Sequence, residues 1–284
     1  MATTAPPECC TTGYIFAGTP TGKEEKLNGL DCYVAMPPSN STATSILICH
    51  DIFGWKMPNT RLVADALAKE GFAVFVPDFF NGYSAPPPNA LDISVAPAAT
   101  MWGRFVQVGR ALSVVPSVAY TVINTKSKYG ALAKSFAAFL KEKHSVAKLG
   151  SIGYCFGGHD SLLLGSISPP LADAVAEAHA GEWSSPPSKD AENLVVPALF
   201  IFSDKDFSLK DADRKGVIET LEERNKEEKT KGWFDFHVYA PSTMHGFAIR
   251  CNEDDPVQKA ERDLALANTK AFFKKWLLDG GAKL

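Results

Sequence analysis

The stretch Lys148-Leu149-Gly150-Ser151-Ile152-Gly153-Tyr154-Cys155-Phe156-Gly157-Gly158 places a cysteine between a buried strand and an apolar helix. A side chain held on a sharp strand-to-helix turn needs small neighbours, and Gly153 and Gly157 supply them. The helix that follows adds free N–H groups and the positive end of its dipole, both of which favour a thiolate. We therefore expect Cys155 to be a nucleophile, the alternative being a buried structural cysteine in a glycine-rich turn.

Strands and helices alternate on both sides of this stretch. Short apolar runs predict strands at 45–50, 72–76, 148–154, 174–179, 195–202 and 234–239. Helix-type spacing predicts helices at 59–70, within 101–143 with breaks near Pro116 and Gly130, after Cys155, and at 210–231 and 256–278. Asn59 is expected to cap the first helix, and Gly71 to end it. Residues 13–36 are expected to form an antiparallel hairpin around a turn region at 22–29.

This order predicts an α/β fold, with a mostly parallel central sheet covered by helices on both faces. Together with a cysteine on a strand-to-helix turn, this order leads us to expect an α/β-hydrolase fold, and residues 1–284 are expected to form one domain. Residues 78–100 are rich in proline, glycine and asparagine, and long loops of this kind often serve as lids. We therefore expect residues 78–145 to form part of the cover of the pocket.

The composition argues against several classes of partner. The chain is 45% hydrophobic and 21% charged with a net charge of -3, and its basic residues are scattered. We therefore expect no nucleic-acid or membrane partner and a small-molecule substrate. The start lacks a signal-peptide pattern, which predicts a cytoplasmic location.

The cysteine and histidine patterns predict neither disulfides nor a metal. The chain has six cysteines, of which Cys9 and Cys10 are the only close pair, and six dispersed histidines without ligand spacing. Packing is the expected role of the Cys9–Cys10 pair, with metal binding as the alternative. Phosphate-binding glycine motifs are absent, so no cofactor is expected.

A nucleophile on this type of turn requires a base and an acid, in the chain order nucleophile, acid, histidine. Asp206 follows the strand expected at 195–202, where a carboxylate can fix the tautomer of a histidine ring. Asp204 is the competing candidate. His245 follows the strand expected at 234–239, and a surface loop histidine is the alternative reading. Because all three residue types occur in the required order, we expect Cys155, Asp206 and His245 to act together.

The chain resembles the dienelactone hydrolase family over nearly its whole length, with an opening similar to that of fungal members. The resemblance rests on four segments, His50-Asp51-Ile52-Phe53-Gly54, Val76-Pro77-Asp78, Gly153-Tyr154-Cys155-Phe156-Gly157-Gly158 and His245-Gly246-Phe247-Ala248. It implies hydrolysis of a lactone or small ester by the triad Cys155, Asp206 and His245.

Two positions depart from the family pattern. Asp51 stands where bacterial members carry a glutamate that keeps the resting thiol neutral. Because aspartate is one methylene shorter, we expect it not to reach Cys155 and to leave the thiol paired with His245 as a thiolate–imidazolium couple. The alternative is a carboxylate that caps backbone N–H groups of the loop. Arg250 corresponds to the arginine that binds the substrate carboxylate, but lies one position further from His245. It is expected to grip a carboxylate or to be a solvated loop charge.

Other residues complete the expected pocket. The backbone N–H groups of Ile52 and Phe156 are expected to form the oxyanion hole of this fold. His179 and Trp102 are candidates for the pocket lining, although a buried, satisfied histidine is an equal alternative for His179. A monomer or homodimer is expected. The competing function is a binding or redox-sensing protein that uses Cys155 only as an oxidisable thiol.

Overall fold

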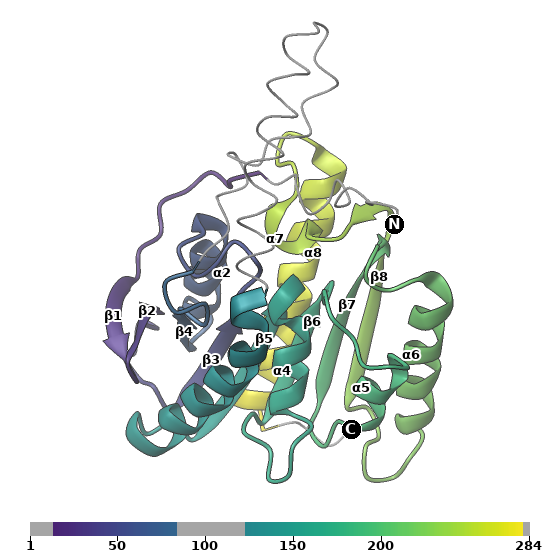
Figure 1. Ribbon diagram of the computed structural model, residues 1–284, viewed down its shortest axis with the longest axis horizontal. Helices are drawn as coiled ribbons and strands as arrows, with labels where there is room; N and C mark the ends of the chain where they lie inside the picture. The colour runs from purple at the N-terminus through teal and green to yellow at the C-terminus, as the bar shows by residue number, and fades with distance from the viewer. Residues whose placement is uncertain (1–13, 84–122, 281–284) are drawn as a thin grey trace, which may run out of the picture.

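An eight-stranded sheet forms the centre of the computed structural model, which describes residues 14–83 and 123–280 (Figure 1). The spatial order is β1-β2-β4-β3-β5-β6-β7-β8, and every pair from β4 to β8 is parallel. The strands are β1 (Lys23–Leu27), β2 (Leu30–Ala35), β3 (Thr44–Cys49), β4 (Ala73–Pro77), β5 (Lys148–Tyr154), β6 (Ala174–Ala178), β7 (Ala198–Lys205) and β8 (Phe234–Met244). The prediction of a mostly parallel sheet is confirmed.

The hairpin at the edge of the sheet is also confirmed, but its turn is narrower than expected. β1 and β2 are joined by Asn28 and Gly29 alone, both with positive φ angles of 48° and 79°. Asparagine and glycine tolerate this conformation, which suits a two-residue turn between twisted strands. Gly22, expected in the turn region, instead precedes β1.

Helices cover both faces of the sheet, as predicted (Figure 1). They are α2 (Pro58–Ala68), a helix at 123–143, α4 (Gly158–Leu164), α5 (Ser188–Glu192), α6 (Asp211–Arg224), α7 (Phe247–Arg250) and α8 (Pro256–Phe273), which continues as a π-helix (Lys274–Leu278). On one face, α2 and α8 pack against Ile46 and Ile48 of β3. On the other, the 123–143 helix, α4 and α6 pack against residues such as Leu149 and Phe200.

Two helix predictions from local rules were wrong. Asn59 is not the N-cap of α2, because Met57 holds that position and Asn59 lies inside the helix. Its buried amide donates to the carbonyl oxygens of Tyr14 (2.7 Å) and Ile249 (2.8 Å). Gly130 does not break the 123–143 helix. The residue there must be small, because a Cβ atom on Gly130 would lie 2.5 Å from a carboxylate oxygen of Asp160 in α4.

Element ends differ where tertiary contacts decide them. β8 runs to Met244 rather than ending at 239, whereas α6 ends at Arg224 rather than 231. The short helices α5 and α7 were not predicted. Trp102, Cys9, Cys10 and the expected break near Pro116 lie outside the described residues.

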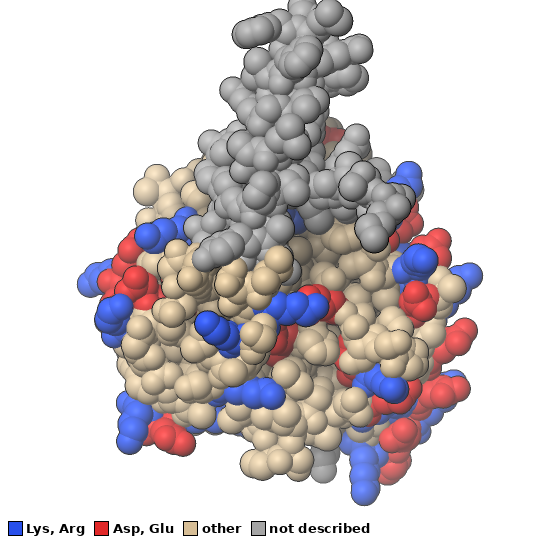
Figure 2. All heavy atoms as spheres, in the orientation of Figure 1, with Lys and Arg blue, Asp and Glu red and all other residues tan. Residues whose placement is uncertain are grey.

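Charges of both signs are mixed over the face seen in Figure 2, with no large patch of one sign among the described residues. Within the described part of the chain, no helix combines the length and apolarity needed to cross a bilayer.

Candidate active site

Cys155 occupies a strained turn between β5 and α4. Its φ angle is 49°, a left-handed value that non-glycine residues rarely adopt, and a 3₁₀ turn (Cys155–Gly157) leads into α4. A Cβ atom on Gly153 would collide with the carbonyl of Gly157, and one on Gly157 would collide with the carbonyl of Cys49. Because glycine alone fits both positions, the chain can pack tightly around the turn. The side chain of Cys155 is 7% exposed.

The end of the sheet brings His245 and Asp206 together. β7 and β8 are parallel neighbours, and their last residues, Lys205 and Met244, pair with each other. The residues that directly follow the two strands are therefore Asp206 and His245. His245 Nδ1 lies 2.9 Å from Asp206 Oδ1 and 3.1 Å from Oδ2. This contact fixes the ring so that Nε2 is the nitrogen available for proton transfer.

Two serines hold the Asp206 carboxylate. Ser203 Oγ donates to Oδ2 at 2.6 Å, while the Ser208 backbone N–H donates to Oδ1 at 2.9 Å. The Ser208 hydroxyl lies 2.6 Å from Oδ1 and 2.7 Å from the carbonyl oxygen of Ala180. Burial alone would raise the pKa of Asp206, but His245 and these donors outweigh it and hold the pKa well below its ordinary value. Neither serine was identified from the sequence.

The electrostatics of His245 favour a charged ring. Burial lowers its pKa, yet the neighbouring Cys155 and Asp206 reverse the effect and raise the pKa to about 10. The buried Nε2 atom has no hydrogen-bond partner of ordinary geometry in the described chain. The surroundings therefore stabilise an imidazolium at His245, and free proton-transfer groups commonly align only when substrate binds.

Asp51 lies near this pair without bonding to the thiol. Its Oδ1 accepts the backbone N–H of Phe53 at 3.0 Å, and its Oδ2 lies 3.6 Å from Arg250 Nη1. Burial raises the pKa of Asp51, while the charges of Arg250 and His245 act against that shift. Neither carboxylate oxygen has a recorded hydrogen bond to Cys155, and the loop-capping contact weighed from the sequence is present.

Arg250 is a buried cation with unused donors. It lies on α7, is 4% exposed, and its guanidinium carbon is 4.7 Å from the centre of the Phe53 ring. Among the described residues, none of its three side-chain nitrogens has a hydrogen-bond partner. Gly246 has a φ angle of 94°, and a Cβ atom there would collide with the guanidinium. The solvated loop charge considered from the sequence is therefore excluded.

His179 lies beside the catalytic histidine candidate. Its φ angle is 42°, and its ring centre is 5.1 Å from that of His245. Burial lowers its pKa well below the ordinary value, with the charge of His245 adding to the effect, so the ring is neutral. Neither ring nitrogen has a hydrogen-bond partner in the described chain. His179 is therefore buried, as the alternative from the sequence assumed, but its ring nitrogens are not satisfied within the described residues.

The two expected oxyanion donors lie at the ends of adjacent strands. Ile52 follows β3, Phe156 follows β5, and these strands are parallel neighbours. The N–H groups of Phe53 and Gly54 bond back to Asp51, whereas no hydrogen bond from the Ile52 N–H is recorded within the described residues. Phe156 is the second residue of the 3₁₀ turn, where N–H groups lack acceptors within the helix.

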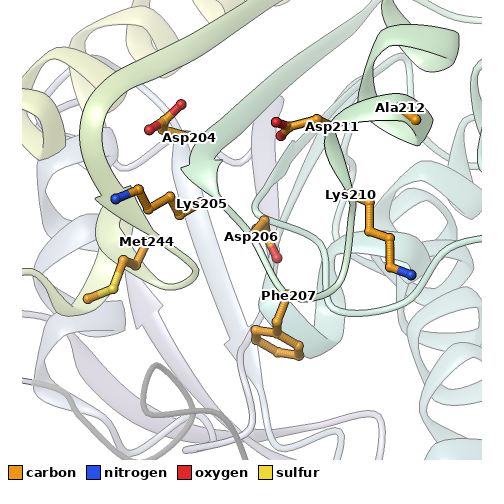
Figure 3. Close-up of a pocket in the computed structure, with 8 residues that line it drawn as sticks. All are labelled: Asp204, Lys205, Asp206, Phe207, Lys210, Asp211, Ala212 and Met244. Carbon is orange, nitrogen blue, oxygen red and sulfur yellow. The ribbon is translucent and has the colours of Figure 1, made fainter.

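An open hollow of about 780 Å³ borders Asp206. Figure 3 shows Asp206 and Phe207 pointing to the same side, while Asp204 points elsewhere. The half-exposed Phe207 ring lies 4.5 Å from the His245 ring, centre to centre. Phe207 therefore forms an apolar edge between this hollow and the histidine, which the sequence interpretation missed.

Comparisons with known proteins identify the family of the chain. The profile described as "Dienelactone hydrolase family" matches residues 30–277. A carboxymethylenebutenolidase homolog from Xenopus tropicalis is 30% identical, with 98% of this chain and 100% of the relative covered. A protein named dienlactone hydrolase 1 from Gibberella moniliformis is 31% identical, with 88% and 86% covered.

A solved structure of similar fold is described as a putative dienelactone hydrolase from Klebsiella pneumoniae. It has a TM-score of 0.58 at 20% identity and covers 87% of this chain and 97% of its own. This likeness concerns the α/β-hydrolase fold, and the sequence matches establish the relationship. The chain therefore belongs to the dienelactone hydrolase family.

Proposed function

We propose that this ester or lactone hydrolase works through a Cys155–His245–Asp206 triad. The observation that carries the proposal is the 2.9 Å contact of His245 Nδ1 with Asp206, at the same sheet edge as the strained turn of Cys155. A cysteine with a left-handed φ angle, beside a histidine whose pKa is raised to about 10, is a costly arrangement for a purely structural residue.

The proposed reaction has two halves. The Cys155 thiolate attacks the carbonyl carbon, and the N–H groups of Ile52 and Phe156 stabilise the resulting oxyanion. The C–O bond then breaks, the leaving oxygen takes a proton from His245, and a thioester remains on Cys155. In the second half, His245 takes a proton from water, whose oxygen attacks the thioester. The C–S bond then breaks, the carboxylic acid leaves, and the Cys155 thiolate is restored beside the protonated His245.

Turnover distinguishes this function from a redox-sensing or binding role. With an activated aryl ester and, separately, a small lactone, the protein should release many equivalents of product per molecule of enzyme. A thiol that is only oxidisable would release at most one equivalent of alcohol and then stop. A single-equivalent release with every ester and lactone tried would exclude the proposed hydrolysis.

We further propose that Arg250 binds a carboxylate on the substrate. Three unpartnered nitrogens on a buried guanidinium are the supporting observation, because a carboxylate satisfies such a fork with two parallel hydrogen bonds. Asp51 lies 3.6 Å away and partly balances the charge in the free enzyme.

Replacing Arg250 by lysine should therefore discriminate between substrates. We expect kcat/KM for a carboxylate-bearing lactone to fall by about 10² because the bidentate contact is lost, and that for a neutral ester to change by less than about threefold. Steady-state kinetics on both substrates measure the difference. Equal losses on the two substrates would show that Arg250 supports the fold and not carboxylate binding.

Asp51 yields a separate prediction on the resting thiol. Because its carboxylate bonds to Phe53 and not to Cys155, we expect iodoacetamide to label Cys155 rapidly without substrate, and still rapidly well below the unperturbed thiol range near pH 8.5. Glutamate at position 51 is one methylene longer and should slow the labelling. Mass spectrometry of the labelled peptide measures the rate. Resistance to labelling until a substrate analogue binds would contradict this assignment.

A further inference from the structure

Glu177 is a buried acid that the proposed reaction does not use. It lies on β6, opposite Gly153 of β5 and Phe200 of β7, and its side chain has no solvent exposure. Oε2 accepts the backbone N–H of Ala180 at 2.9 Å, whereas Oε1 has no hydrogen-bond partner in the described chain. The backbone N–H groups of Ala180 and Ile201 favour the charged form of this carboxyl, but burial outweighs them, so it is poorly prepared to carry a charge at this depth.

The segment that Glu177 holds, residues 178–181, contacts Cys155 directly and Asp206 through Ser208. Gly181 N–H donates to the carbonyl oxygen of Cys155 at 2.7 Å. The carbonyl oxygen of Ala180 lies 2.7 Å from the hydroxyl of Ser208, which is itself 2.6 Å from Asp206 Oδ1. Both contacts extend from the Ala180–Gly181 peptide, and the Ala180 N–H that donates to Glu177 fixes the neighbouring peptide of the same segment.

The same segment also packs against the start of α4. A Cβ atom on Gly158 would lie 2.5 Å from the Cβ atom of Ala180, so the two backbones touch with no spare room. His179, next to Ala180, is in ring contact with His245. A shift of the segment would thus be transmitted to the cysteine turn, to Asp206 and to His245 together.

We propose, on the basis of the proposed function, that Glu177 is a positioning residue whose neutral form holds residues 178–181 against Cys155 and Asp206, and that its ionisation loosens this hold. Ionisation would leave a charged, half-bonded carboxylate inside the sheet. Residues 178–181 would then have to move or admit water, and the triad would lose its alignment.

The charges around Glu177 support a protonated resting form. Burial is the main influence and raises its pKa to about 8, with Asp206 after β7 adding to the rise and His245 after β8 opposing it. The titratable groups of α4 are engaged elsewhere, since His159 lies 3.4 Å from Asp190 and Asp160 lies beside Gly130. The residue of β5 opposite Glu177 is Gly153, which has no side chain. The next titratable residues along the chain are Tyr154, at the end of β5, and Cys155, on the turn.

Thermal unfolding tests the buried proton independently of catalysis. The folded protein keeps the proton up to a pKa of about 8, whereas an unfolded chain loses it near its ordinary value of 4.5. The stability that Glu177 contributes is therefore complete below pH 4.5, falls as the pH rises toward 8, and is constant above that. Glutamine does not titrate, so Glu177→Gln lacks this fall in stability. The melting temperature of the variant minus that of the wild type should therefore increase as the pH rises from 4.5 to 8.

Kinetics test the positioning role. The amide oxygen of Glu177→Gln can still accept the Ala180 N–H, so kcat/KM at pH 7 should stay within about twofold of the wild type, and the loss of activity expected above pH 8 should disappear. Glu177→Met has no acceptor, and its kcat/KM should fall by about tenfold at every pH because the Ala180 N–H is left unpaired. Glu182 is an acid that directly follows this segment and pairs with Lys126, so Glu182→Gln serves as the matched control and should retain the wild-type profile.

The outcomes separate this inference from the proposed function. A wild-type protein without Cys155-dependent turnover would refute the proposed function, while the melting curves would still test the buried proton. A melting difference between Glu177→Gln and the wild type that is constant from pH 4.5 to 8 would overturn the inference. It would equally be overturned if the Gln variant kept the alkaline loss of activity. Should the Met variant not fold, these two measurements on the Gln variant decide the question.

Discussion

Replacing Cys155 by alanine should lower kcat for ester hydrolysis by at least about 10³-fold, because no other group is placed to form the covalent intermediate. The fold should survive. Alanine keeps the Cβ atom, and the side chain of Cys155 is small and only 7% exposed, so the melting temperature should change by less than about 3 °C. Circular dichroism during heating and steady-state kinetics on the same preparation measure the two effects.

Cys155→Ser tests whether the reaction requires sulfur, because serine differs from cysteine only in having a hydroxyl in place of the thiol. Its hydroxyl is a poorer nucleophile than the thiol, and His245 would have to activate it in a site arranged for sulfur. We expect activity close to that of the alanine variant. Residual activity above a few per cent in Cys155→Ala would rule out Cys155 as the nucleophile.

The second large effect is expected for Asp206→Asn, with kcat lowered by about 10³ to 10⁴, as for the equivalent change in serine proteases. The asparagine cannot stabilise an imidazolium and can hold the His245 ring in the wrong tautomer. Because Asp206 also helps to raise the pKa of His245, the histidine should titrate at lower pH in the variant. NMR of the His245 ring over a pH series measures that shift alongside the kinetics.

Asp204→Asn is the control for this experiment. The backbone N–H of Asp204 bonds to Thr243 Oγ1 at 3.0 Å, and its side chain points away from Asp206 in Figure 3. We expect kcat to change by less than about threefold, as for a surface substitution away from the reacting groups. If the control lowers kcat more than Asp206→Asn does, Asp204 is the acid.

The sheet and the order of the candidate triad were predictable because both depend on patterns along the chain. Buried strands appear as apolar runs, and parallel strands bring their carboxyl ends to one edge. Residues that follow different strands, such as Cys155, Asp206 and His245, therefore meet without being near in sequence.

Local rules failed where distant contacts decide the structure. Asn59 looks like a helix cap, yet its amide bridges the N-terminal segment and α7. Gly130 looks like a helix breaker but allows α4 to approach. Two other residues could be found from the sequence only through weak signals. Ser208 is a serine two residues after Asp206, and Glu177 is the single acid in an apolar strand. Only the folded structure shows which groups face them.

Mass spectrometry of the acylated enzyme tests the central claim most directly. During turnover of a slowly hydrolysed aryl ester, the reaction is quenched with acid, which preserves a thioester, and the protein is digested. The account predicts that the peptide containing Cys155 carries the mass of the acyl group, and that this mass disappears once the ester is consumed. Continued release of alcohol with the acyl group on another residue, or with Cys155 unmodified at every time point, would contradict it.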